Sequence, residues 1–186
     1  MLSALQIKFL HDGVASISGS SHIDLNWNDL NDERWEKAQI YKGKEVVSDG
    51  SIRKAKVIDK SFIPDAYDLI EKEIRNNIFA LARDHFNVRF DKIIGSQIVK
   101  YETGDFFLPH IDSGRTYPER VLTIIKYLSV GYSGGETYFP EIDLTPKIKA
   151  PDYLIFFPEL LHGAHPVLSG SKVVFVSWLC KDIISW

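Results

Sequence analysis

Residues 101–112 read YETGDFFLPHID, and this stretch joins strand-forming residues to a His-x-Asp pair. Aromatic and apolar residues lead up to His110 and Asp112, and a polar run, SGRTYPE, follows at residues 113–119. Side chains two positions apart in a strand point to the same face, so we expect His110 and Asp112 to share a face while Ile111 faces the opposite layer. The stretch predicts a strand that leaves the core carrying a histidine and a carboxylate. A surface histidine beside a turn aspartate is the alternative.

Short β-branched and aromatic runs separated by Gly, Pro, Asp and Ser fill the second half of the chain. Their spacing of roughly 8–12 residues is typical of a sandwich or barrel and unlike βαβ units. One long helix is expected before them, from Pro64 to about His85, because apolar residues recur there at spacings of three and four. The expected strands are IIGSQIVKYE, FFLPHID, RVLTIIKYLSV, ETYFP, DYLIFF and KVVFVSWL.

The length of 186 residues predicts a single domain. We expect residues 1–60 to form an N-terminal extension with a mobile, substrate-facing loop at 41–51, and residues 61–186 to form the helix and the β core. The formal charge of −3, with both signs interspersed, offers no basic stripe and therefore excludes nucleic acid as an expected partner.

A reducing compartment fits the cysteine content. The single cysteine, Cys180, lies in an apolar run and is expected to be a small buried side chain, so a cytoplasmic location is predicted. The first residues do not resemble a signal peptide, and no run approaches the ~18 apolar residues of a membrane span, so no membrane partner is expected. The sequence makes no prediction of an oligomeric state.

Two further histidines, His162 and His165, follow the apolar run YLIFFPELL. We expect the segment 162–168 to lead through the turn Ser169-Gly170 into the final strand and to form a hairpin with it. Two histidines and one carboxylate are the ligands of non-haem iron(II) sites that keep positions open for oxygen and a co-substrate. The chain is therefore expected to activate dioxygen.

The final strand, KVVFVSWL, carries a lysine at the head of an apolar row. Alternation places the lysine with three residues on one face and leaves Val173 and Phe175 for the outer layer. A lysine there either extends to solvent from the strand end or, beside an open iron site, binds an anionic co-substrate. The row is Lys172, Val174, Val176 and Trp178.

Taken together, these motifs resemble iron(II)/2-oxoglutarate-dependent dioxygenases of the prolyl 4-hydroxylase type over roughly residues 60–183. The resemblance implies a double-stranded β-helix (jelly roll), mainly β with flanking helices, and a structural role for the GGET turn. The matching positions are Tyr101, Gly104, Phe106, His110, Asp112, Thr123, Tyr127, Leu128, Gly134, Gly135, Glu136, Thr137, Phe139, Pro140, His162, Pro166, Val167, Gly170, Lys172 and Trp178.

The resemblance also implies roles for individual residues. Three residues would be the metal ligands, namely His110, Asp112 and His162. Lys172 would pair with the distal carboxylate of 2-oxoglutarate, and Tyr127 and Tyr101 match co-substrate positions. Each tyrosine has an alternative as a core aromatic whose hydroxyl bonds to the backbone.

The activity that follows is hydroxylation of an unactivated C–H bond, with release of succinate and CO2. The cofactor and co-substrates would be Fe(II), 2-oxoglutarate and O2, with ascorbate as an optional reductant. The leading partner is a peptide with a prolyl residue, and Arg115 is a candidate substrate contact against the alternative that it is only solvated. Two alternatives stay open: a hydroxylase of a free amino acid or other small-molecule substrate, and a non-catalytic metal-binding jelly-roll module.

Overall fold

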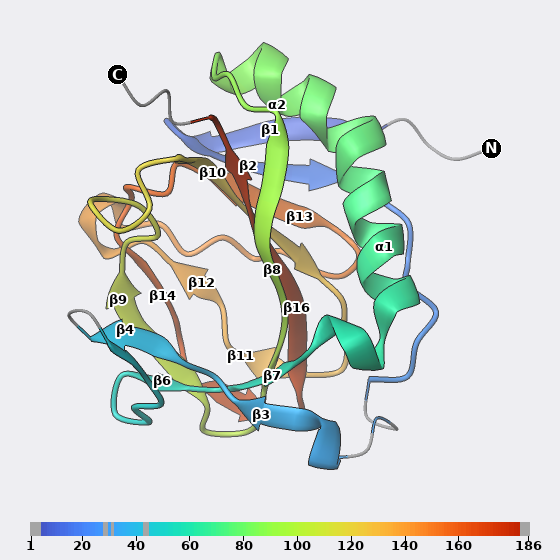
Figure 1. The fold of residues 1–186 in the computed structure, drawn as a ribbon, viewed down its shortest axis with the longest axis vertical. Helices are drawn as coiled ribbons and strands as arrows, with labels where there is room; N and C mark the ends of the chain where they lie inside the picture. The colour runs from blue at the N-terminus through green and yellow to red at the C-terminus, as the bar shows by residue number, and fades with distance from the viewer. Residues whose placement is uncertain (1–4, 28–29, 31, 43–44, 183–186) are drawn as a thin grey trace.

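The computed structural model describes residues 5–27, 30, 32–42 and 45–182. Two β-sheets face each other, and a long helical segment covers the outer face of the larger sheet (Figure 1). The architecture is mainly β with flanking helices, and the predicted double-stranded β-helix is confirmed.

The larger sheet holds eight of the described strands, and its pairings are antiparallel. In spatial order they are β1 (Gln6–His11), β2 (Val14–Ser18), β13 (Tyr153–Phe156), β10 (Arg120–Tyr127), β16 (Lys172–Cys180), β8 (Lys92–Tyr101), β7 (Lys56–Ile58) and β3 (Trp35–Lys37). The smaller sheet is β12 (Thr137–Tyr138), β14 (His162–Ala164), β9 (Phe106–His110) and β6 (Arg53–Lys54). Two separate ladders join β11 (Ser133–Gly134) to β15 (Val167–Ser169) and β4 (Ile40–Lys42) to β5 (Glu45–Val47).

The first sixty residues contribute more than an extension. Strands β1 and β2 form one end of the larger sheet, β3 and β7 form its other end, and β6 completes the smaller sheet. The polar segment 41–51, expected to be a loop, overlaps the paired strands β4 and β5, in which Ile40 lies opposite Val47. Ile40, Tyr41, Val46 and Val47 belong to residue types that favour strands, which explains why these two segments pair.

The helical segment runs without a break from Pro64 to Phe86, one residue beyond the predicted end. It comprises α1 (Pro64–Glu73), a π-helical turn (Ile74–Ile78) and α2 (Phe79–Phe86). Asn87 closes it in the left-handed conformation, with φ of 52°. Short 3₁₀ turns occur at Asp32–Arg34, Lys60–Phe62 and Pro140–Ile142.

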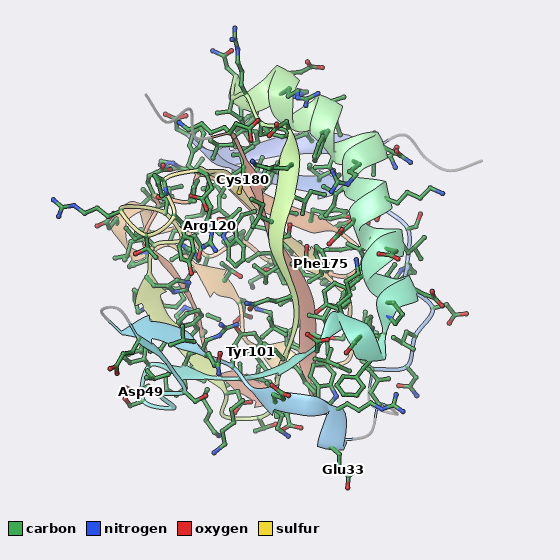
Figure 2. The ribbon with its side chains drawn as sticks, viewed as in Figure 1. Glu33, Asp49, Tyr101, Arg120, Phe175 and Cys180 are labelled. Atoms are coloured by element: carbon green, nitrogen blue, oxygen red, sulfur yellow. The ribbon has the colours of Figure 1, made fainter. Side chains whose placement is uncertain are left out.

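Two apolar layers result from the alternation along each strand. The outer layer lies between the helical segment and the larger sheet, where Ile70 and Ile74 pack with Phe175 in one buried cluster. Figure 2 shows Phe175 on the side of β16 that faces the helix. The inner layer lies between the two sheets and includes Tyr101 and Val174. The prediction that odd and even residues of the last strand face different layers is confirmed.

A buried polar cluster fastens the helix to the larger sheet. The fully buried ammonium of Lys126 donates to Glu73 Oε2 at 2.8 Å, and the Tyr153 hydroxyl donates to the same oxygen at 2.6 Å. Lys126 also donates to Ser20 Oγ at 2.7 Å. Burial alone would raise the pKa of Glu73, but these hydrogen bonds lower it overall, so the carboxylate stays charged.

The hairpin expected between residues 162–168 and the final strand was wrong. β14 pairs with β9 and β12 in the smaller sheet, whereas β16 pairs with β10 and β8 in the larger one. The intervening strand β15 pairs with β11. The chain therefore changes sheets at the turn, which is the crossing that a jelly roll requires.

Candidate metal centre

Three side chains that the sequence separates by up to 52 positions (162 − 110) meet at one end of the space between the sheets. His110 ends β9 and lies opposite His162, the first residue of β14, across the ladder. The carboxylate of Asp112 lies 3.5 Å from His110 Nε2 through Oδ1 and 3.4 Å from His162 Nε2 through Oδ2. The three potential ligand atoms lie within 4.8 Å of one another.

Both histidines are turned the same way by the backbone. His110 Nδ1 lies 3.0 Å from the carbonyl of Leu108, and His162 Nδ1 lies 2.9 Å from the carbonyl of Leu160. A carbonyl only accepts, so each Nδ1 carries a proton and each ring directs its Nε2 toward Asp112. Burial lowers the pKa of His162 to about 4, which keeps that ring neutral near pH 7.

Asp112 is held from three directions although it lies beyond the end of β9. Its carboxylate accepts a hydrogen bond from Thr123 Oγ1 at 2.8 Å, and its backbone N–H donates to the carbonyl of Pro158 at 2.8 Å. Its own carbonyl accepts from Arg120 Nη1 at 2.8 Å. Burial alone would raise the pKa of Asp112, but hydrogen bonding and the adjacent imidazoles lower it well below its usual range. The side chain is therefore an anion.

This donor set fits a divalent first-row metal. Two imidazoles and one carboxylate form the facial triad of non-haem iron(II) proteins. Donors bound at about 2.1 Å and at right angles around one ion lie about 3 Å apart, close to the observed 3.4 and 3.5 Å. The Nδ1–carbonyl hydrogen bonds are of the kind that orients metal-binding histidines.

A cavity of about 350 Å³ opens from the triad and reaches Lys172. The other members of the predicted row, Val174, Val176 and Trp178, line the same cavity. Lys172 is 2% exposed, and its ammonium donates to the carbonyl of Gly135 at 2.6 Å. No described carboxylate forms an ion pair with it, and burial lowers its pKa to about 8. The lysine thus faces inward.

The two predicted tyrosines flank Lys172 differently. Lys172 Nζ lies 5.2 Å from the ring centre of Tyr101 and 5.4 Å from that of Tyr127. Tyr101 lines the cavity, whereas the Tyr127 hydroxyl lies 3.0 Å from Thr137 Oγ1, and it is Thr137 that lines the cavity. Burial raises the pKa of both hydroxyls, so both keep their protons.

The remaining predicted residues lie away from the triad. His165 is exposed and stacks on Tyr138, with ring centres 4.0 Å apart. Arg115 is exposed in the segment after Asp112. Ile111 does not face the layer opposite to His110 and Asp112, as predicted: it is 49% exposed and lines the same cavity as they do, because β9 ends at His110 and alternation stops there.

Several cavity residues were not predicted from the sequence as functional. Arg120 lies between the rings of Tyr117 and Trp178, with its guanidinium carbon 3.6 Å from each ring centre. Arg53, from β6, packs over the ring of Phe107 at 4.8 Å. Thr123 was noted only as a family position. The available signal was alternation, because Thr123 and Ile125 share the inward face of β10.

A jelly roll whose cavity is lined by two histidines and one carboxylate has the donor set of mononuclear, non-haem metal proteins. Residues 96–180 match the 2OG-Fe(II) oxygenase superfamily. A relative from Acanthamoeba polyphaga mimivirus, named as a prolyl 4-hydroxylase type protein, is 32% identical over 114 residues, which are 50% of this chain and 47% of that protein. Prolyl 4-hydroxylase 1 of Arabidopsis thaliana is 27% identical over 117 residues, 48% of this chain and 41% of the relative. The predicted resemblance to iron(II)/2-oxoglutarate oxygenases of the prolyl 4-hydroxylase type is confirmed.

Solved structures share the fold. A Pseudomonas putida prolyl-4-hydroxylase superposes with a TM-score of 0.61 at 17% identity, covering 72% of this chain and 76% of that one. The viral collagen prolyl hydroxylase of Paramecium bursaria Chlorella virus-1, solved with 2OG, gives 0.54 at 23% identity, covering 70% and 79%.

The chain spans about half the length of the first curated relatives it matches, 47% and 52%. Within the described residues, no helix has the length and apolar character needed to cross a membrane.

Proposed function

We propose that the chain is an iron(II)- and 2-oxoglutarate-dependent dioxygenase that hydroxylates an unactivated C–H bond, with a peptidyl prolyl residue as the leading substrate. The observation that carries this proposal is Lys172, a buried ammonium without a described carboxylate partner, in the same cavity as the triad. A purely structural metal site has no use for such a charge. A dianionic co-substrate does.

The proposed ligands are His110, Asp112 and His162. Iron(II), 2-oxoglutarate and O2 would together supply the oxidising power for C–H hydroxylation, with release of succinate and CO2. The chain contributes two imidazoles, one anionic carboxylate and the cavity that they line. Thr123 and Arg120 hold Asp112 so that its carboxylate keeps its direction toward both histidines.

Lys172 is proposed to bind the distal carboxylate of 2-oxoglutarate, with Tyr101 as a hydrogen-bond donor from the cavity wall. Tyr127 stays in the proposed set because its ring lies 5.4 Å from Lys172 Nζ. Its contact to Thr137 supports a role in fixing that wall. Ascorbate is included in the assay as the optional reductant.

A peptide is favoured over a free amino acid by the donors that line the cavity. Arg53 Nε, Arg120 Nε and Trp178 Nε1 are buried and, among described atoms, have no hydrogen-bond partner. Buried N–H groups need acceptors, and peptide carbonyls supply several in a row. A solved structure with the same fold, a prolyl hydroxylase from Trichoplax adhaerens, is a complex with a peptide fragment of hypoxia inducible factor. A hydroxylase of a free amino acid or other small metabolite would use the same metal ligands and co-substrate, but it would not need these contacts.

The remaining proposals concern the whole chain. Residues 1–60 and 61–186 are proposed to differ in role within one domain. Segments 41–51 and 113–119 would face the substrate, and the jelly roll would bind the metal. A cytoplasmic location is proposed on the single cysteine, Cys180, which is buried and unpaired.

The test is succinate release that requires both iron(II) and 2-oxoglutarate, screened over proline-containing peptides and free amino acids. Dependence of turnover on the residues flanking proline would support a peptide substrate. Turnover of free proline or another amino acid alone would select the small-molecule alternative. Metal binding without any succinate, with every substrate tried, would leave the non-catalytic module and refute the enzyme.

A further inference from the structure

We propose that Gly95 is a positioning residue for the metal centre, acting through Trp178 and Arg120. The inference rests on the proposed metal-binding function of Asp112. The absence of a side chain at Gly95 leaves the space that the indole of Trp178 occupies. The indole, in turn, fixes the guanidinium that holds the backbone of Asp112.

The first link is the contact between Gly95 and the indole. A Cβ built on Gly95 would lie 2.9 Å from both Cε3 and Cζ3 of Trp178 and 3.9 Å from Arg120 Nη2. Gly95 has φ of +71°, and the β16–β8 ladder shifts register between Val176 and Trp178, so that Trp178 lies opposite Ile94. This irregularity turns the glycine backbone toward the ring.

The second link is the clamp on Arg120, the residue labelled in Figure 2 where β10 begins. Tyr117 covers one face of its guanidinium and Trp178 the other, each with its ring centre 3.6 Å away. Trp178 is only 8% exposed. A methyl group at Gly95 would therefore displace the ring toward the cavity that it lines, and with it the guanidinium that the ring covers.

The third link is the hydrogen bond from Arg120 Nη1 to the carbonyl of Asp112, 2.8 Å long. Asp112 lies outside regular strand structure, so this bond and the one to Pro158 define where its backbone lies. Displacing the indole shifts the guanidinium, and the shift reaches the carboxylate of Asp112. Groups that orient metal ligands typically change metal affinity 10–100-fold when mutated.

A control separates this contact from backbone strain. Alanine at any position with positive φ destabilises the fold, whatever surrounds it. Gly131 has φ of +79°, and nothing lies within 4 Å of the Cβ that alanine would add. Gly95→Ala and Gly131→Ala therefore share the strain, and only the first adds the contact with Trp178.

The experiment measures Co(II) binding to the full chain, without co-substrate, by its visible absorption. We expect Gly95→Ala to raise the Co(II) Kd by about tenfold, at the low end of the effect of ligand-orienting groups, and Gly131→Ala to leave it within about twofold of wild type. Equal Kd values for the two variants would overturn the proposal.

A second background tests the route through the indole. Trp178→Leu removes the ring atoms that the new Cβ would meet, so adding Gly95→Ala to it should cause no further loss of Co(II) affinity. If Gly95→Ala alone fails to fold, recovery of folding in the double variant supports the contact, and continued failure to fold rejects it.

The near-ultraviolet circular dichroism of Trp178, taken as wild type minus Trp178→Leu, tests the first link without metal. It should change in Gly95→Ala and not in Gly131→Ala. Absence of Co(II) binding by the wild-type chain would refute the proposed metal centre. An unchanged indole signal in Gly95→Ala would instead refute the role of Gly95 alone.

Discussion

Replacing Lys172 by methionine should make the empty protein more stable while weakening its affinity for 2-oxoglutarate. Burial lowers the pKa of Lys172 from 10.5 to about 8, which corresponds to a cost of roughly 3 kcal/mol at pH 7. Methionine has a similar length and no charge. It also loses the hydrogen bond to Gly135, worth about 1.5 kcal/mol, so the net gain is about 1–2 kcal/mol and Tm should rise by about 2–8 °C.

The pH dependence has a defined sign. Between pH 8 and 10.5 the unfolded chain keeps the Lys172 proton that the folded chain has lost, so wild-type stability rises with pH in that window. Lys172→Met lacks this rise. Its stability advantage over wild type should therefore shrink above about pH 8.

The effect on the co-substrate runs the other way. A charged hydrogen bond contributes about 1.5–3 kcal/mol, so the 2-oxoglutarate KM should increase about 10–150-fold in Lys172→Met. In the wild type the KM should also increase as pH passes about 8, where the ammonium is lost. Lys172→Arg, which keeps its charge, should show a smaller increase and no such pH dependence.

Thermal unfolding with and without 2-oxoglutarate, in the presence of Mn(II), measures both effects on the same samples. The Tm of the wild type should rise when 2-oxoglutarate is added, and the Tm of Lys172→Met should rise much less at the same concentration. A lower Tm for Lys172→Met without ligand, together with an unchanged 2-oxoglutarate affinity, would show that the Lys172 ammonium reaches solvent and is not buried in the cavity.

Three further outcomes are expected. Asp112→Ala should abolish hydroxylation and weaken iron binding, since it removes the anionic ligand; a wild-type rate in this variant would reject the metal assignment. His162→Ala should lose bound iron and succinate release, whereas His165→Ala, whose ring stacks on the protein surface, should keep the metal and most activity; bound iron and succinate measured side by side would expose a reversed assignment. Segments 41–51 and 113–119 should gain protection from proteolysis when the true substrate is added to the enzyme, as closing loops do; identical cleavage with and without substrate would argue against closure.

Local patterns predicted much of this structure because they report on which face a residue occupies. Alternation in the last strand placed Lys172 and Phe175 on opposite faces, which holds, but it left open whether the Lys172 ammonium is buried or reaches solvent. Spacings of three and four predicted the helix from Pro64, although not its π-helical turn. Each of these features depends on neighbours within a few residues.

Long-range pairing was not predictable from the same signals. The turn Ser169-Gly170 favours a hairpin, but the partner of each strand depends on the whole sheet, and β14 lies against β9 instead. The contact from Arg120 to the Asp112 carbonyl was missed for a similar reason. It depends on Trp178, 58 positions later (178 − 120), and on a backbone acceptor that carries no sequence signal.

The buried cluster at Glu73 has a consequence for the register of the central strands. The two side chains that donate to Glu73 Oε2, Lys126 and Tyr153, lie opposite each other in the β10–β13 ladder. A slip of one residue in β10 would turn Lys126 away from the helix and into the space between the sheets. Glu73 therefore accepts both hydrogen bonds only when β10 and β13 are paired in their native register. The complete cluster therefore requires β10 and β13 in their native register, and it disfavours chains whose central strands are misaligned.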